Sequence, residues 1–200
     1  MVLKKVNACR EARLNSKDLG ARKLADRPTQ FRDLNNPSQY LCIPAVSSEN
    51  RRYVPMRFFD KDVIPVMSVL YIENATLYDF GILNSDTHMA WMRTVAGRLE
   101  MRYRYSKDIV YNNFPWPDPT TSQRVKIEQT AQAILDAREL YPEASLADLY
   151  DELTMPPELR KAHKANDKAV WEAYGKAWPL DDEPACVAYL MRLYQQITGI

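Results

Sequence analysis

A short segment near the middle of the chain, Phe114-Pro115-Trp116-Pro117-Asp118-Pro119, constrains the fold more than any other feature. Its three prolines lie within five residues, and proline lacks the backbone N–H that a helix interior or a central strand requires. The residue before each proline is also restricted to extended conformations. No regular element can therefore cross this segment, so the sequences on its two sides must form separate elements.

The sequence before this segment is typical of short buried strands. Apolar runs separated by polar turns extend over Tyr40–Val46, Tyr53–Phe59 and Val63–Ile72, and such runs predict strands of a sheet. Pro55 and Pro65 cannot donate to a ladder, so we expect them at a sheet edge or at strand ends.

One clear helix follows these strands. Ser85 is a good N-cap residue, Asp86 suits the first turn, and Gly97 is typical of a C-terminal stop. The residues expected to face the core are Met89, Trp91, Met92, Val95 and Ala96. Shorter elements are expected as a helix at Cys9–Leu14 and as strands at Glu100–Tyr105 and Ile109–Tyr111.

The sequence after the proline segment changes to helical spacing. Apolar residues recur every three or four positions at Ile127, Ala131, Ile134, Ala137 and Tyr141. Ser145 and Asp148 form the pattern of a capping box, and Pro157 suits the first turn of another helix. A final helix has one apolar face formed by Val187, Leu190, Met191, Tyr194 and Ile197. The chain is therefore predicted to be α+β, with a mixed α/β module over residues 1–119 followed by a small antiparallel helical module over residues 120–200.

The net charge of +1 conceals two halves of opposite sign. Residues 1–107 contain 18 Lys and Arg against 11 Asp and Glu, whereas residues 108–200 contain 9 against 15. A basic half is typical of a surface that faces a polyanion, although an excess of this size also arises by chance.

Several other classes of protein are disfavoured. Cys9, Cys42 and Cys186 are far apart and lack metal-ligand spacing, so we expect three free, small core residues in a reducing compartment, the cytoplasm. No apolar stretch approaches the roughly 20 residues of a membrane helix. His88 and His163 have no partner at catalytic spacing and are expected to have structural or surface roles. No catalytic residue and no metal ligand is assigned.

The stretch from Arg98 to Lys107 mixes basic and aromatic residues. On a strand, alternate residues share a face, which would place Arg98, Glu100, Arg102 and Arg104 together. In a DNA major groove, Glu100 could accept a hydrogen bond from cytosine N4 and Arg102 could bind guanine, so the two could read one C·G pair. Arg98, Arg104 and Lys107 would then hold phosphates. The alternative is an ordinary surface ion pair.

These segments resemble those of MmeI-like enzymes, a family of adenine-specific DNA methyltransferases that often carry an endonuclease in the same chain. The resemblance runs from about residue 5 to the end. It is carried by Pro44–Glu49, Asp79–Leu83, Ser85–Trp91, Gly97–Leu99, Arg102–Ser106, Val110–Pro117, Leu149–Tyr150, Met155–His163 and Asp167–Val170.

The resemblance implies a DNA target recognition domain over residues 1–119 and a C-terminal helical domain over residues 120–200. It implies that Glu100 and Arg102 occupy a base-reading position pair. The other positions that it suggests are Ala45, Met67 and Ser68 for base reading, with Arg51 and Arg52 as additional phosphate ligands. Because Ala45, Met67 and Ser68 are poor hydrogen-bonding residues, we expect them to contact a thymine methyl group or no base at all.

The same resemblance implies double-stranded DNA and a methyltransferase domain as partners. It also implies S-adenosylmethionine as the cofactor of the longer enzyme, with no cofactor in these 200 residues. Asn112–Trp116 has the residue types of the family's base-holding tetrapeptide in the wrong order, so methyl transfer by this chain alone is not expected. The rival interpretation is a protein-interaction module whose acidic helical half docks a partner; the sequence leaves the oligomeric state open.

Overall fold

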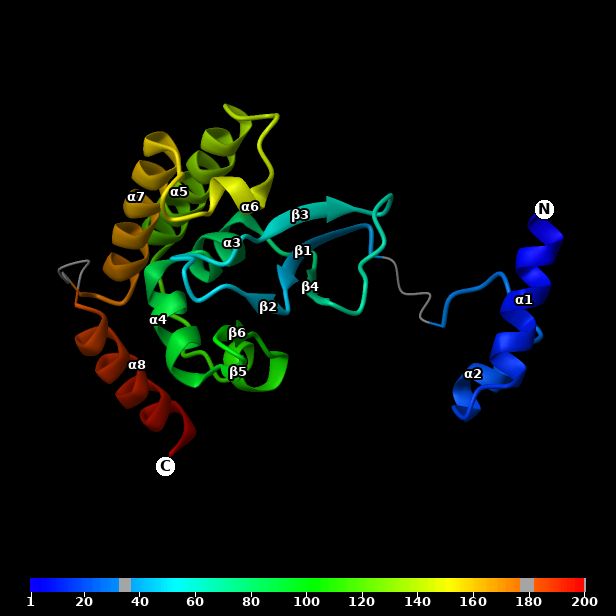
Figure 1. Ribbon diagram of the computed structural model, residues 1–200. Coiled ribbons are helices and arrows are strands. Elements are labelled where there is room, and N and C mark those ends of the chain that lie inside the picture. Colours follow the sequence, from blue (N-terminus) through cyan, green and yellow to red (C-terminus); the bar gives the residue numbers. More distant parts are fainter. Residues whose placement is uncertain (33–36, 177–181, 200) are drawn as a thin grey trace. The chain divides into compact units, whose positions relative to one another are not determined.

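The computed structural model describes residues 1–32, 37–176 and 182–199, and divides the chain into two compact units, residues 1–36 and residues 37–200 (Figure 1). The first unit contains α1 (Val2–Leu14) and α2 (Leu19–Lys23). Arg13 joins the unit by donating to three backbone carbonyls, those of Leu24, Arg27 and Gln30. The predicted helix at Cys9–Leu14 was too short, since α1 already begins at Val2.

Two small antiparallel sheets form the first part of the second unit. One has the order β3 (Arg57–Asp60), β1 (Gln39–Pro44), β4 (Val69–Glu73), and the other has the order β2 (Val46–Ser47), β6 (Arg102–Arg104), β5 (Gly97–Leu99). Ala45 connects them, because its N–H donates to the Ser68 carbonyl at 3.1 Å and its carbonyl accepts from the Tyr105 N–H at 2.9 Å. One chain segment therefore contributes a strand to each sheet.

Two of the predicted strands are shorter than the apolar runs that suggested them. Pro55 lies before β3, which begins only at Arg57. The buried Val54 is therefore not part of a strand, and its N–H instead contacts Met89 Sδ at 3.4 Å. The residues around Pro65 form a loop, closed by a turn in which the Val69 N–H donates to the Val66 carbonyl at 3.1 Å. Both prolines thus precede strand starts, as predicted.

Two further predictions near the middle of the chain were wrong, and a third was right about position but not about conformation. Glu100–Tyr105 is not one strand but part of the β5–β6 hairpin, with its turn at Glu100 and Met101. Ile109–Tyr111 belongs to a short π-helix, η1 (Lys107–Tyr111), whose N-cap Ser106 accepts from the Ile109 N–H. The helix before Gly97 does end where predicted, at Val95, but Ala96 leaves it in an extended conformation and Gly97 begins β5 without a left-handed backbone.

Helices pack around these sheets. They are α3 (Leu77–Leu83), α4 (Asp86–Val95), α5 (Thr121–Glu139), α6 (Leu146–Leu149), α7 (Pro157–Ala173) and α8 (Glu183–Thr198). The Ser85 N-cap, the Ser145–Asp148 capping box and the position of Pro157 at the first turn are confirmed. Figure 1 shows α5 and α7 antiparallel and side by side, and α8 running beside α4. The predicted α+β class is therefore confirmed.

A single hydrophobic core extends across the proline segment. Phe114 is buried, and the Pro115 carbonyl accepts a hydrogen bond from the Tyr174 hydroxyl of the helical part at 2.8 Å. Residues 37–200 consequently pack as one compact unit, while the division at residues 119 and 120 stays a prediction. Met89, Trp91 and Met92 lie in this core as expected.

The cysteines and the absence of a membrane helix were also expected from the sequence. All three cysteines are free, but only Cys186 is buried; Cys9 and Cys42 are half-buried. Within the described ranges, no helix is long and apolar enough to cross a membrane.

Candidate nucleic-acid interface

The β5–β6 hairpin presents the predicted reading pair at its turn. Glu100 has a left-handed backbone with φ of 58°, which turns the chain between the strands. Glu100 and Arg102 form an ion pair at 2.8 Å, with side chains 76% and 47% exposed. The prediction that Arg98, Glu100, Arg102 and Arg104 share one face of a single strand was therefore wrong, but the hairpin still brings the pair together at the surface. A pair this exposed contributes little to stability.

Arg98 is engaged within the same hairpin. Its Nη1 donates to the Met101 carbonyl at 2.9 Å, and its guanidinium lies 3.9 Å from the centre of the Tyr103 ring. Arg98 and Tyr103 are paired across the two strands, and Tyr103 is buried. Arg98 is exposed, and its side chain contacts both the turn and the neighbouring strand.

The three other predicted reading positions lie at the link between the two sheets. Ser68 accepts the Ala45 N–H, so these two residues are adjacent, and Met67 beside them is fully exposed. The Ala45 carbonyl binds the N–H of Tyr105, which directly follows β6. The strand β6 therefore joins this cluster to the hairpin turn, over roughly 10 Å at the usual rise per residue.

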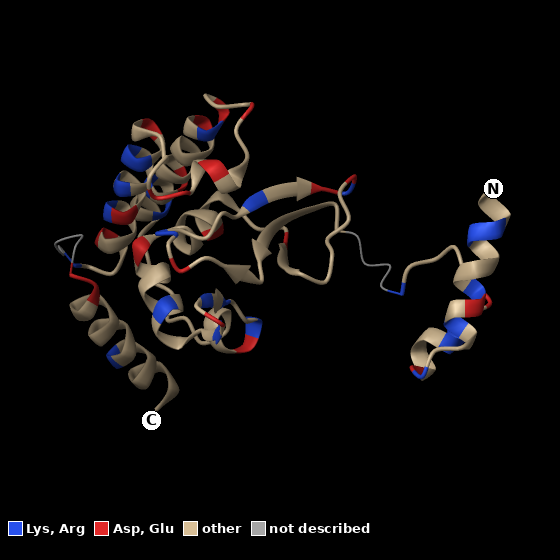
Figure 2. Ribbon diagram, viewed as in Figure 1, with Lys and Arg blue, Asp and Glu red and all other residues tan. Residues whose placement is uncertain are grey.

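The predicted phosphate ligands differ in their freedom to bind. Arg104 and Lys107 are exposed, and in the described part of the chain neither side chain has a hydrogen bond or ion pair. Figure 2 shows Lys and Arg gathered on the β5–β6 hairpin with few acidic residues. Arg51 is half-buried and lines a cavity of about 370 Å³ together with Arg52. Arg52 instead donates to Asp86 at 2.6 Å, which occupies its guanidinium.

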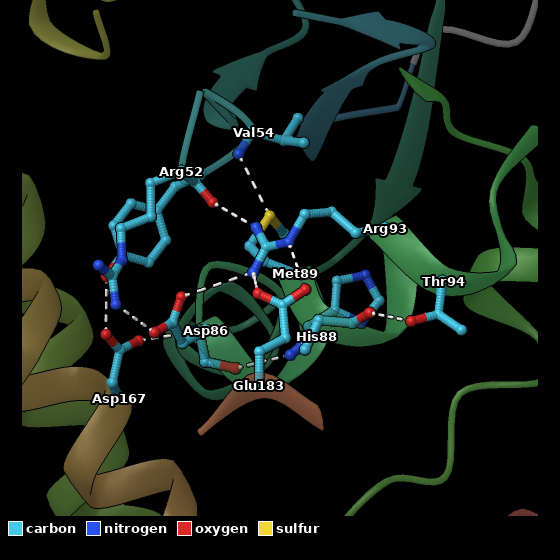
Figure 3. Close-up of polar contacts among 12 residues, drawn as sticks. Arg52, Val54, Asp86, His88, Met89, Arg93, Thr94, Asp167 and Glu183 are labelled. Atoms are coloured by element: carbon cyan, nitrogen blue, oxygen red, sulfur yellow. Dashed lines mark hydrogen bonds and ion pairs between the residues drawn. The ribbon is translucent and has the colours of Figure 1, made fainter. Parts of the chain in front are cut away.

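Asp86 is the centre of a polar network that the sequence did not reveal (Figure 3). Arg93 of α4 approaches Asp86 at 3.9 Å and binds Glu183 of α8 through two hydrogen bonds. Asp167, from α7, is buried and accepts the Asp86 N–H at 2.7 Å, at the first turn of α4. The helical part of the chain therefore fixes the start of the helix that leads into the hairpin.

A buried cluster continues from Asp167 into the helical part. The Tyr53 hydroxyl donates to Asp167 at 2.7 Å, and the Tyr53 ring stacks on His163, with 4.0 Å between ring centres. His163 hydrogen-bonds the Tyr150 hydroxyl at 2.7 Å, which also accepts from Arg138. Burial holds the pKa of His163 well below its ordinary value, so this ring is neutral and structural.

His88 has an equivalent role in the sheet part of the unit. It is buried, its Nε2 lies 2.8 Å from the Tyr105 hydroxyl, and burial lowers its pKa to about 3. The structural role expected for both histidines is confirmed. Within the described residues, no group of three or more His, Cys, Asp or Glu side chains could hold a metal ion.

Asp167 should make stability depend on pH. Burial and the neighbouring Asp86 raise the pKa of Asp167 to about 7. Between pH 4 and pH 7 the folded chain then keeps a proton that the unfolded chain has lost, so this residue's contribution to stability falls as pH rises. His88 and His163 act in the opposite direction, because their pKa values are lowered.

The contribution of Asp167 is therefore measured as a difference between the wild-type chain and Asp167→Asn. We expect urea unfolding at pH 5, 6 and 7 to show the variant gaining stability relative to the wild-type chain as pH rises. Two curves with the same dependence on pH would contradict the raised pKa.

Known proteins and family models match this chain over nearly its whole length. Residues 1–118 match the model of the MmeI target recognition domain, and residues 120–200 match that of the MmeI C-terminal domain. A curated relative, DNA methyltransferase A of Bacillus subtilis (strain 168), is 40% identical over 200 residues, which is 99% of this chain and 22% of the relative.

A solved structure gives the same result. It is that of the Type IIL restriction-modification enzyme MmeI in complex with DNA, with 46% sequence identity and a TM-score of 0.93. The match covers 100% of this chain and 27% of the MmeI chain. The chain thus spans about a quarter of the length of these relatives. It belongs to the MmeI family of DNA methyltransferases and restriction-modification enzymes, and corresponds to the target recognition and C-terminal domains of that family.

Proposed function

We propose that this chain recognises a specific sequence in double-stranded DNA, as the target recognition part of an adenine-specific DNA methyltransferase. The observation that carries the proposal is the exposed Glu100–Arg102 pair at the tip of a hairpin that also contains Arg98 and Arg104, with Lys107 following at the start of η1. The MmeI structure to which the whole chain is similar was solved in complex with DNA, which supports DNA as the partner of this chain.

The hairpin tip suits the major groove. Glu100 accepts a hydrogen bond from cytosine N4, and Arg102 donates to guanine O6 and N7, so the pair reads both bases of one C·G pair. Before binding, the two side chains neutralise each other at 2.8 Å. The tip therefore adds little nonspecific attraction to phosphates, which falls instead to Arg104 and Lys107, with Arg51 as a further candidate.

Ala45, Met67 and Ser68 form a second, weaker reading cluster. The exposed Met67 side chain suits contact with a thymine methyl group. Arg52 is omitted from the phosphate ligands of this proposal, because Asp86 already holds it.

S-adenosylmethionine does not fit the residues of this chain. Nucleotide-like cofactors are held by a glycine-rich turn between a strand and a helix. Gly81 lies within α3, Gly97 begins β5, Gly20 lies within α2, and Gly175 and Gly199 follow helices. In this proposal the cofactor and the reacting adenine belong to another domain of the longer enzyme.

The rival interpretation, an acidic helical docking face, has no such support. Figure 2 shows both charge signs on α5 and α7. The helix α7 contains Arg160, Lys161, Lys164 and Lys168 as well as acidic residues, and its Asp167 is buried within the polar network.

The proposal is tested by selecting duplexes from a randomised DNA library with the 200-residue chain at low salt. We expect one preferred sequence, bound less tightly as salt rises. In the double variant Glu100→Lys and Arg102→Asp, opposite charges are kept at the tip, so we expect the preferred base pair to change at one position only.

If the double variant prefers the same DNA sequence as the wild-type chain, Glu100 and Arg102 are not base-reading residues. No sequence preference in the wild-type chain would overturn the proposed function itself. Binding by the wild-type chain that is insensitive to salt would also contradict it, because phosphate contacts release counterions.

A further inference from the structure

The turn that carries the reading pair is held by one side chain from the opposite strand. Arg98 donates to the Met101 carbonyl at 2.9 Å while its guanidinium lies over the buried Tyr103 ring, 3.9 Å from the ring centre. The strand register pairs Arg98 with Tyr103, and Tyr103 in turn pairs with Ser47 of β2. Arg98 thus connects the turn to the body of the sheet.

This support matters because the turn is strained at the residue that reads. Glu100 has φ of 58°, a left-handed conformation that glycine or asparagine adopts far more readily than glutamate. A glutamate is retained at a costly backbone position only when surrounding contacts determine its conformation. In the described structure those contacts are the Glu100–Arg102 ion pair and the Arg98–Met101 hydrogen bond.

We propose that Arg98 is a positioning residue for specificity: it fixes the left-handed turn so that Glu100 and Arg102 reach one base pair together, and it does not bind a phosphate. This inference rests on the proposed function. Lysine cannot take its place, since a lysine ammonium lacks the planar group that stacks on an aromatic ring while donating sideways to a carbonyl.

The two possible roles of Arg98 predict different measurements. A phosphate ligand contributes charge, so Arg98→Ala would reduce the slope of log binding constant against log salt by about 0.9, and Arg98→Lys would restore it. A positioning residue contributes geometry, so both variants should keep the wild-type slope. Both should then lose discrimination at the base pair read by Glu100 and Arg102, by about tenfold or more.

The experiment uses the 200-residue chain, its selected duplex, and duplexes carrying each substitution at the critical base pair, over a series of salt concentrations. Arg104→Ala is the matched control, because Arg104 lies on the same hairpin, is exposed and has no side-chain partner among the residues that the structure describes. It should lower the slope by about 0.9 and leave base preference unchanged. Tyr103→Phe keeps the aromatic face and should behave as the wild-type chain, whereas Tyr103→Leu should reproduce Arg98→Lys.

The inference would be overturned if Arg98→Lys distinguished base pairs as well as the wild-type chain does. It would also be overturned if Arg98→Ala reduced the slope of log binding constant against log salt. Either result would leave the proposed function intact. Absence of sequence preference in the wild-type chain would instead overturn the proposed function. Circular dichroism and thermal unfolding of each variant separate a local change of the turn from unfolding of the chain. This control matters most for the Tyr103 variants, because the Tyr103 side chain belongs to the hydrophobic core.

Discussion

Replacing Asp167 with alanine is expected to lower the free energy of unfolding by about 2–4 kcal/mol at neutral pH. The carboxylate accepts the Tyr53 hydroxyl and the Asp86 N–H, both at 2.7 Å, in a site that excludes water. Alanine leaves both donors unsatisfied and removes the contact that α7 makes with the start of α4. The stability lost with these two hydrogen bonds should exceed the stability gained when the repulsion between Asp167 and Asp86 is removed.

Two further variants separate the causes of this loss. Asp167→Asn keeps an oxygen for the Asp86 N–H without the buried charge, so it should cost less than half as much as alanine. Tyr53→Phe removes a single hydrogen bond and should cost about 1 kcal/mol. Urea unfolding at pH 7 measures all three. Wild-type stability of Asp167→Ala would mean that this contact does not join the helical part to the recognition part.

Replacing Gly81 with alanine is expected to destabilise the chain by about 1–3 kcal/mol, although alanine favours helices more than glycine. A Cβ at position 81 would lie 2.7 Å from Ile127 Cγ2 and 3.1 Å from both Ala131 Cβ and Asn166 Oδ1. Ile127 is fully buried, and its branched methyl group cannot move aside. The Gly81 carbonyl also accepts a hydrogen bond from Asn166 at 2.7 Å, which the displacement would lengthen.

The matched control for this prediction is Gly97→Ala. A Cβ at Gly97 meets no atom within 4 Å, and Gly97 has no left-handed backbone, so stability should change by less than about 0.5 kcal/mol. The midpoint temperature of thermal unfolding should therefore be several degrees lower for Gly81→Ala than for the wild-type chain, and unchanged for Gly97→Ala. Equal midpoints for the two variants would show that α3 and α5 can separate without cost.

The sequence by itself determined the features that depend on a few neighbouring residues. Ser85, Ser145 and Pro157 identify helix starts, because a cap or a first-turn proline acts on backbone groups within three or four positions. The helical spacing after Pro119 likewise gave the helical part, and the family segments gave the correspondence to the MmeI domains. The Glu100–Arg102 pair was found because its members are two residues apart.

Only the tertiary structure decided how distant residues share bonds and space. Composition and periodicity could not show that Glu100 turns left-handed, since the same alternation suits a strand or a hairpin. The partners of Asp167 lie 81 and 114 residues away along the chain, and nothing local identifies them. Gly81 looks like a weak helix residue until Ile127 packs against it. Local hydrogen bonding follows from sequence, whereas the pairing of buried polar groups and the close approach of helices follow from the packing of the whole core.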